Sequence, residues 1–246
     1  MKRGIIKLPG FFLFVLIILL SSSRAQDIHG GLGNFFSGAV YNNSSSLQTD
    51  LSSGELLGDN LELNKLVFSY GGAGYSVRPR GFVLGGSGYT YQVSSDAVNG
   101  NANLSVSCGF FNIGYRVINK NKCLGFPYTG MGGFGTNFKI TNSTSEKMMV
   151  IGTDTIGPGK QSKYSTGGLA FDVGFALKYF AFNMEKKEKN KAMGAVLGID
   201  AGASFFPAFG KWEHVVTGDQ ISTMSNPFIM TAYLRITVGF GVFSAP

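Results

Sequence analysis

The chain has 246 residues, of which 36 are glycine, 22 are phenylalanine and 10 are tyrosine, and only 14% are charged. A typical soluble domain carries about 25% charged residues, so this composition argues against an ordinary cytosolic enzyme. The formal net charge is +7, but four basic residues lie within residues 1–25, and the rest of the chain carries +3. That remainder has no basic stripe and no recognised binding motif, which excludes a nucleic-acid partner.

The first 25 residues have the three parts of a secretory signal peptide. Lys2, Arg3 and Lys7 form a basic region, and an apolar run follows from Phe11 to Leu20. Ten apolar residues are too few for a membrane-spanning helix, which needs about 20. The small residues of Ser23-Arg24-Ala25 predict cleavage after Ala25 and a mature chain of residues 26–246.

The rest of the chain alternates in a two-residue period and is rich in aromatic residues and glycine, which favours strands over helices. Each segment is long enough to cross a bilayer at a tilt, which takes about 9–11 residues. Eight segments are expected as strands: His29–Asn42, Glu62–Val77, Gly81–Ser94, Ala102–Ile118, Cys123–Thr141, Tyr164–Phe182, Ala192–Phe209 and Pro227–Phe243.

The connections between these segments alternate in length. Three are long, namely Asn43–Leu61, Asn142–Lys163 and Gly210–Asn226. The turns between them are short, and Ser95–Asn101 is intermediate. An even number of strands with alternating long loops and short turns is typical of outer-membrane barrels. The sequence therefore predicts an all-β fold, an eight-stranded antiparallel up-and-down transmembrane β-barrel.

Charge differs between the two kinds of connection. The short turns are basic, with Arg78, Arg80, Lys120, Lys122, Lys186, Lys187, Lys189 and Lys191. They could meet anionic lipid head groups at one membrane face, or they could simply be solvated turns. The segment Asn43–Glu62 contains Asp50, Glu55 and Asp59 and is predicted to be an exposed acidic loop.

Alternation also places charges inside the barrel. In the sixth segment, Leu169 through Tyr179 at every second residue would face lipid, which turns Asp172 and Lys178 inward. The same rule turns Asp200 and Arg235 inward in the last two segments. Antiparallel pairing predicts Asp172 opposite Gly202, and Arg235 opposite Ala201. Further inward candidates are Lys139 and Arg116.

A lumen charge cluster of Asp172, Asp200, Arg235 and Lys178 is therefore expected. Buried charges need partners, and one arginine can bridge two carboxylates. The cluster is interpreted as a salt-bridge network that fills a narrow barrel, because eight strands leave an interior just wide enough for side chains. A conductance or catalytic site remains the alternative interpretation.

In the fourth segment, the apolar residues switch from one face of the predicted strand to the other. Leu104, Val106 and Phe110 share one face, whereas Phe111 and Ile113 take the other. A β-bulge near Phe110–Phe111 would place all of these residues on the lipid side.

Several segments resemble small outer-membrane β-barrel proteins of Gram-negative bacteria, the size class of the OmpA membrane domain, OmpX and OmpW. Gly114-Tyr115, the basic turn after it and Pro127–Gly132 are similar to hairpins of such barrels. The last strand, YLRITVGFGVF with Gly239, Phe240 and Phe243, is similar to their C-terminal assembly signal. The resemblance implies insertion by the outer-membrane assembly machinery and implies no single activity.

The chemistry-bearing residues are few. Cys108 and Cys123 fall at different heights of one predicted hairpin, so free thiols are expected rather than a disulfide. No metal-ligand spacing occurs, and neither a metal nor another cofactor is expected. Ser204 and the Glu213-His214 pair could serve a lipid A-modifying enzyme, but nothing in the sequence brings them together.

The sequence therefore predicts an integral protein of the bacterial outer membrane with a structural or interaction role and no enzymatic activity. Its long loops would contact surface partners or other envelope proteins, and outer-membrane lipid would surround it. A narrow pore for small solutes is the alternative function, and a lipid A-modifying enzyme is a third hypothesis. A soluble lipocalin-like barrel would need polar outward faces, which the last three strands lack.

Overall fold

The computed structural model describes most of the chain beyond the predicted signal peptide. It describes residues 29–44, 64–97, 100–120, 122–144, 146, 148–151, 154–181, 184–186, 191–221 and 228–244. The predicted signal peptide, residues 1–25, and most of the predicted acidic loop Asn43–Glu62 lie outside the described residues.

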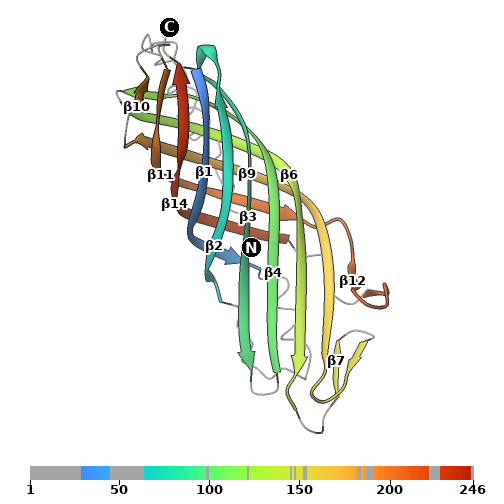
Figure 1. Cartoon of the computed structure of the whole chain (residues 1–246). Helices are drawn as coiled ribbons and strands as arrows, with labels where there is room; N and C mark the ends of the chain where they lie inside the picture. Colours follow the sequence, from blue (N-terminus) through green and yellow to red (C-terminus); the bar gives the residue numbers. More distant parts are fainter. Residues whose placement is uncertain are drawn as a thin grey trace, which may run out of the picture.

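Eight long strands cover the eight segments that the sequence predicts, which confirms the all-β fold class (Figure 1). They are β1 (His29–Asn43), β2 (Leu66–Val77), β3 (Phe82–Ala97), β4 (Gly100–Tyr115), β6 (Cys123–Asn142), β9 (Gln161–Phe180), β11 (Lys191–Pro207) and β14 (Phe228–Ser244).

The eight strands form one closed antiparallel barrel. Consecutive long strands pair with one another, and β14 also pairs with β1 from His29↔Ser244 to Asn43↔Met230. Closure gives every long strand a hydrogen-bonded neighbour on both sides. The backbone polar groups are then satisfied within the sheet, which is the condition for strands to cross a bilayer.

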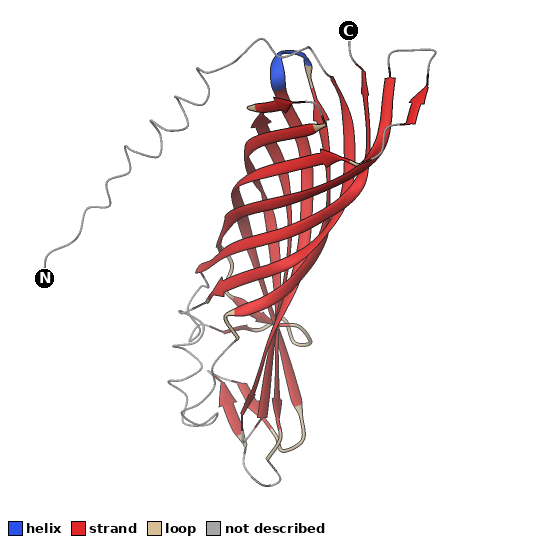
Figure 2. Cartoon of the chain, turned by 90° about the vertical axis from the view of Figure 1, so that its left-hand side faces the viewer, coloured by secondary structure: helices blue, strands red, loops and turns tan. Residues whose placement is uncertain are grey.

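Short turns and the ends of the barrel chain lie together at one end, which we call the turn end (Figure 2). There β2 and β3 are joined by the single-turn helix η1 (Pro79–Gly81). Gly81 has φ of +89°, a backbone conformation that glycine adopts at no steric cost. The predicted short turn around Arg78 and Arg80 is confirmed, and both arginines are exposed. We call the opposite end the loop end.

Four strands continue past their neighbours at the loop end. The pairing of β2 with β3 stops at Ser69↔Tyr91, but β3 pairs with β4 as far as Ala97↔Gly100. The four continuations form a curved sheet, visible at the bottom of Figure 1, that we call the extension. The extension comprises residues 91–97, 100–107, 135–142 and 161–168.

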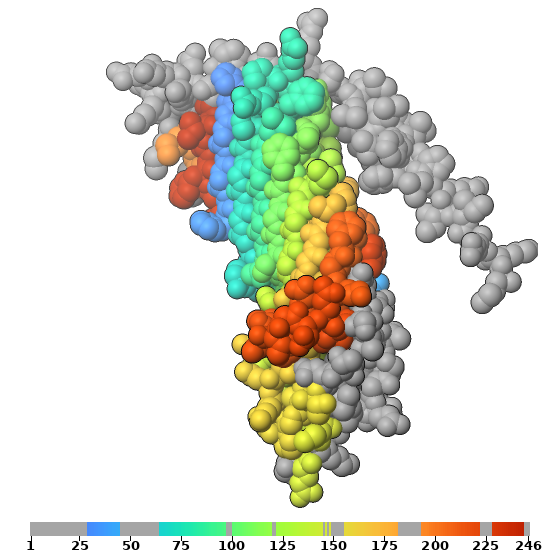
Figure 3. Space-filling model, turned by 90° about the vertical axis from the view of Figure 1, so that its right-hand side faces the viewer, coloured from blue at the N-terminus to red at the C-terminus, as the bar shows by residue number. Residues whose placement is uncertain are grey.

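Two predicted loops contain further strands. Asn142–Lys163 holds the hairpin of β7 (Met149–Ile151) and β8 (Asp154–Ile156), as well as the start of β9. Gly210–Asn226 holds β12 (Trp212–His214) and β13 (Gln220–Ile221), and β12 pairs with the free edge of β9. Figure 3 shows this orange-red segment lying against the yellow residues of the loop end. Two short strands, β5 (Ile118–Lys120) and β10 (Met184–Lys186), pair with β6 and β11.

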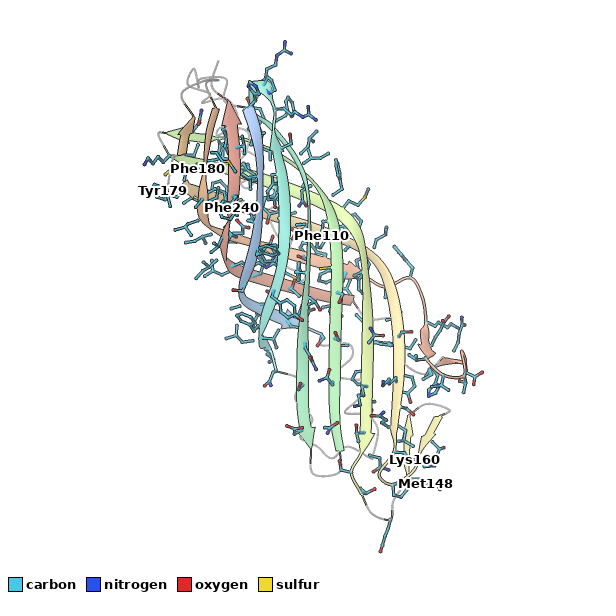
Figure 4. The ribbon with its side chains drawn as sticks, viewed as in Figure 1. Phe110, Met148, Lys160, Tyr179, Phe180 and Phe240 are labelled. Atoms are coloured by element: carbon cyan, nitrogen blue, oxygen red, sulfur yellow. The ribbon has the colours of Figure 1, made fainter. Side chains whose placement is uncertain are left out.

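The barrel wall is apolar on its outside. The predicted lipid-facing side chains of β9, β11 and β14 are exposed, with exposed fractions from 38% to 68%: Leu169, Phe171, Val173, Phe175, Leu177, Tyr179, Met193, Leu197, Ile199, Met230, Leu234, Ile236, Val238, Phe240 and Val242. Tyr179 and Phe240 lie toward the turn end (Figure 4). We call this surface the lipid belt.

The alternation of polar and apolar residues inverts in the extension. Its outward side chains are polar, for example Gln92, Asn137 and Lys163, whereas its inward side chains, such as Leu104 and Phe138, are buried. The extension thus has the polar outer face and apolar inner face of a sheet in a soluble protein, whereas the rest of the wall has an apolar outer face suited to lipid.

This inversion corrects the predicted bulge in the fourth strand. β4 keeps an uninterrupted register with both neighbours from Gly100 to Gly114. Leu104, Val106 and Phe110 are buried inside, and Phe111 and Ile113 are exposed outside. No parity change is needed, because one face of β4 fills the interior at every level and the other meets lipid only near the turn end.

Candidate functional site: the polar layer of the barrel lumen

The interior of the barrel has three levels. Toward the turn end lies an apolar cluster that includes Val77, Val83 and Phe126. Toward the loop end lies a larger one that includes Val93, Phe138 and Trp212. Between them lie buried polar residues, which we call the polar layer: Asn34, Asn112, Asp172, Lys178, Asp200, Ser204, Arg235 and Thr237.

All four predicted lumen charges face the interior and are almost inaccessible. The exposed fraction is 1% for Asp172, 0% for Lys178, 3% for Asp200 and 3% for Arg235. Each lies at an inward position of a strand whose alternate residues form the lipid belt. The alternation of inward and outward side chains along each strand is therefore sufficient to explain their burial.

Lys178 and Asp200 form a buried ion pair. The Nζ atom of Lys178 lies 2.5 Å from Oδ1 of Asp200. The same ammonium donates a hydrogen bond of 3.0 Å to Oγ1 of Thr237 on β14. Three neighbouring strands are thus joined by one side chain, and a buried pair of this kind stabilises only while both partners are present.

Asp172 accepts hydrogen bonds from two chains of hydroxyl groups. Ser204 donates to its Oδ1 atom at 2.7 Å, and the Tyr233 hydroxyl lies 3.1 Å from both carboxylate oxygens. Tyr89 donates to Ser204 at 2.8 Å. Tyr128 lies 2.8 Å from the Tyr233 hydroxyl and is its donor, because the Tyr233 proton is directed to Asp172. Both chains therefore end on the same carboxylate.

Arg235 lies opposite Asp200 in the strand register, one residue from the predicted position. Asp172 lies opposite Ser204 rather than Gly202. The expected bridge from Arg235 to both carboxylates does not form: Lys178 is the ion-pair partner of Asp200, and hydroxyl groups are the partners of Asp172.

The guanidinium of Arg235 instead packs on aromatic rings. Its Cζ atom lies 3.8 Å from the ring centroid of Tyr89 and 3.7 Å from that of Tyr233. Phe36 lies further away at 4.8 Å. Cation–π contacts of this kind are favourable in a desolvated site. Within the described part of the chain, its Nε and Nη2 atoms have no hydrogen-bond partner.

Glycine makes room for the tyrosine hydroxyls. A Cβ atom added at Gly174 would lie 2.6 Å from the Tyr128 hydroxyl and 2.7 Å from that of Tyr233. Real Cβ contacts are never so short, so the hydroxyls that complete the Asp172 network need glycine at this inward position. The network was not predicted to include four of its members, although the two-residue period already turns Tyr233 and Ser204 inward: Tyr89, Tyr128, Tyr233 and Ser204.

Two other inward candidates differ from each other. Arg116 is buried, at 8% exposure, near the turn end. Lys139 is exposed on the outer face of the extension, so its expected inward position was wrong. The cause is the inversion described above, since Phe138 and Ile140 fill the interior on either side of it.

The residues considered for catalysis lie apart. Ser204 pairs in register with Asp172 on β9, whereas His214 pairs with Tyr164. Eight residues along a strand correspond to about 26 Å, which is far beyond hydrogen-bond reach. Cys108 and Cys123 are both free, as expected.

No cluster of three or more His, Cys, Asp or Glu side chains among the described residues is suited to a metal ion. No helix in the described part of the chain has the length and apolar character needed to cross a membrane.

A closed barrel of eight antiparallel strands with a lipid belt is a transmembrane β-barrel of the Gram-negative outer-membrane class. The lipid belt and the closed sheet together locate the chain in the bacterial outer membrane. Outer-membrane lipid therefore surrounds the belt.

Solved structures with a similar chain course include an attachment protein and two outer-membrane proteins. Ail of Yersinia pestis, in complex with a heparin analogue, is 11% identical over 87% of this chain and 98% of its own, with a TM-score of 0.48. OprG of Pseudomonas aeruginosa is 10% identical over 91% and 99%, with a TM-score of 0.33. The protease OmpT of Escherichia coli is 10% identical over 91% and 99%, with a TM-score of 0.34. No protein-family profile and no curated protein sequence matches the chain.

Proposed function

We propose that the protein is an integral outer-membrane barrel with a sealed lumen, no enzymatic activity and an interaction role carried by the extension. The inversion of polarity at the loop end supports this proposal most directly. A sheet with a polar outer face and a buried apolar core is made to stand in water beyond the bilayer. Its partners would be surface molecules or other envelope proteins, and the outer-membrane assembly machinery would insert the barrel.

The sealed lumen follows from the three interior levels. A water-filled pore needs a polar path from one end to the other. The polar layer instead lies between two apolar clusters, and large side chains such as Phe126, Phe138 and Trp212 are fully buried in them. The charges of the polar layer then connect strands to one another, which favours the structural interpretation of the cluster over a conductance site.

The orientation follows from the general architecture of outer-membrane barrels. These proteins have short periplasmic turns and longer extracellular loops. The turn end would then face the periplasm with both ends of the mature chain, and the extension would project from the cell surface. Arg78 and Arg80 would lie at the periplasmic rim.

Labelling of single cysteines on intact cells tests this orientation. In a background with Cys108 and Cys123 replaced by Ala, a membrane-impermeant maleimide should label Asn137→Cys on the extension. Arg78→Cys should be labelled only after the outer membrane is permeabilised. Both positions are exposed, so accessibility to the reagent differs only by compartment. The reverse pattern would place the extension in the periplasm and refute the proposal.

Planar-bilayer recording tests the sealed lumen. The purified protein should insert without producing conductance steps under conditions in which a general porin conducts. Arg235→Gln and Asp200→Asn should also remain silent, because both apolar clusters stay in place. Steps in the wild-type protein that change size in either variant would establish the alternative function, a narrow pore for small solutes.

A further inference from the structure

Two lysines face each other on the outer surface of the extension. Lys139 on β6 and Lys163 on β9 are directly paired in the strand register, and both side chains are exposed on the same face. We call them the lysine pair. On the other side of Lys139, Asn103 of β4 is its register partner, and the Asn103 amide donates one hydrogen bond of 3.1 Å to Oγ of Ser94.

Like charges directly opposite each other in a sheet are unfavourable. Their Cβ atoms lie about 4.5–5.5 Å apart, and such pairs destabilise the sheet. Among the described residues, neither lysine has an ion-pair partner. The carboxylate nearest in register on this face is that of Glu213, which is paired with Ser165 and accepts a hydrogen bond from Gln220. An anion between the two ammonium groups would remove the repulsion.

The height of the lysine pair indicates where such an anion would come from. On β9 the lipid belt ends at Leu169, and Lys163 lies six residues beyond it. Six residues span about 20 Å along a strand. At the usual barrel tilt of about 35–45°, this places the pair about 15 Å above the hydrocarbon edge. That height lies outside the hydrocarbon, in the layer occupied by the sugar and phosphate groups of a large glycolipid.

We propose that the lysine pair binds a phosphate group on the headgroup of an outer-leaflet glycolipid. A phosphate monoester carries a charge between −1.5 and −2 at neutral pH and offers several acceptor oxygens, so it can neutralise both ammonium groups at once. Asn103 supplies the second N–H of its amide beside them, because the first donates to Ser94. The proposal rests on the orientation given under the proposed function, in which the extension faces the outer leaflet.

The test compares glycolipid binding by matched variants. The purified full-length protein in non-ionic detergent is titrated with fluorescent lipopolysaccharide, and with the same lipid after enzymatic dephosphorylation. A basic residue near a charged membrane contributes about 1 kcal/mol, so Lys139→Gln/Lys163→Gln should bind about 30-fold more weakly. Lys160→Gln, an exposed lysine at the far loop end (Figure 4), should bind like the wild type. The dephosphorylated lipid should bind the wild type as weakly as the double variant binds the intact lipid.

A second variant separates binding from folding. Lys139→Glu replaces the like-charged pair by an opposite-charged one at the position away from Glu213, so its unfolding temperature in phosphate-free detergent should rise while glycolipid binding is lost. Equal binding by the wild type and the double Gln variant would overturn the site. Competition by inorganic phosphate at the same concentration as the glycolipid would overturn the lipid as its source. The cysteine labelling above tests orientation independently, so a wrong orientation is distinguishable from a wrong site.

Discussion

Replacing Lys178 by Met should lower the free energy of unfolding by about 3–5 kcal/mol, because it leaves the Asp200 carboxylate buried without its partner. The ammonium of Lys178 lies 2.5 Å from that carboxylate and also bonds to Thr237, and both partners of the ion pair are almost fully buried. Urea unfolding in lipid vesicles measures the free energy. A second measure comes from gel electrophoresis in detergent after samples are heated to a series of temperatures. It is the temperature above which the band of the folded protein disappears.

Two further variants make this result interpretable. Lys178→Met/Asp200→Leu removes both charges and should recover most of the lost stability, since an apolar pair of similar volume often replaces a buried ion pair at little cost. Lys160→Met changes an exposed lysine and should leave the free energy of unfolding within about 0.5 kcal/mol of the wild type. Equal values for Lys178→Met and Lys160→Met would show that the buried pair contributes nothing.

Replacing Ile236 by Arg should cost about 2–4 kcal/mol, the penalty for a basic side chain at the midplane of a membrane barrel. Ile236 is 66% exposed on the lipid belt and lies at the centre of β14. Gln92→Arg introduces the same side chain on the outer face of the extension, where it should change stability by less than about 0.5 kcal/mol.

This pair of substitutions measures the polarity inversion itself. Both residues point outward from the same closed sheet, so only the surrounding solvent differs between them. Urea unfolding in lipid vesicles gives both costs under one set of conditions. Similar penalties at the two positions would mean that the lipid boundary does not fall between the belt and the extension.

The architecture was readable from the sequence because alternation is a local property. Along β9, β11 and β14, aliphatic and aromatic side chains recur at every second residue, and Asp172, Asp200 and Arg235 take the opposite parity. A one-residue slip would turn all of them over, so the hydrophobic pattern specifies the inward face strongly. The number of strands followed from the turn signals between the segments.

The register between neighbouring strands was harder to predict from the sequence. The length of a loop does not determine the register of the strands that it joins, which is why Asp172 was expected two residues away from its partner on β11. The choice of Lys178 over Arg235 as the partner of Asp200 depends on the packing of Arg235 between Tyr89 and Tyr233. Tyr89 lies on β3, far away in sequence, so no local pattern could have revealed this contact.

The sequence by itself determined the all-β class, the eight strands, the lipid-facing register of the last three and the burial of four charges. Only the tertiary structure decided which side of β4 and β6 is inside at the loop end. The alternation of polar and apolar residues shows that a strand has two unlike faces, but it does not show which face points into the barrel. That depends on whether lipid or water surrounds the strand at each height. Lys139 therefore lies on the outer face, opposite to the position expected from a rule that holds only within the bilayer, and Leu104 lies inside without the predicted bulge.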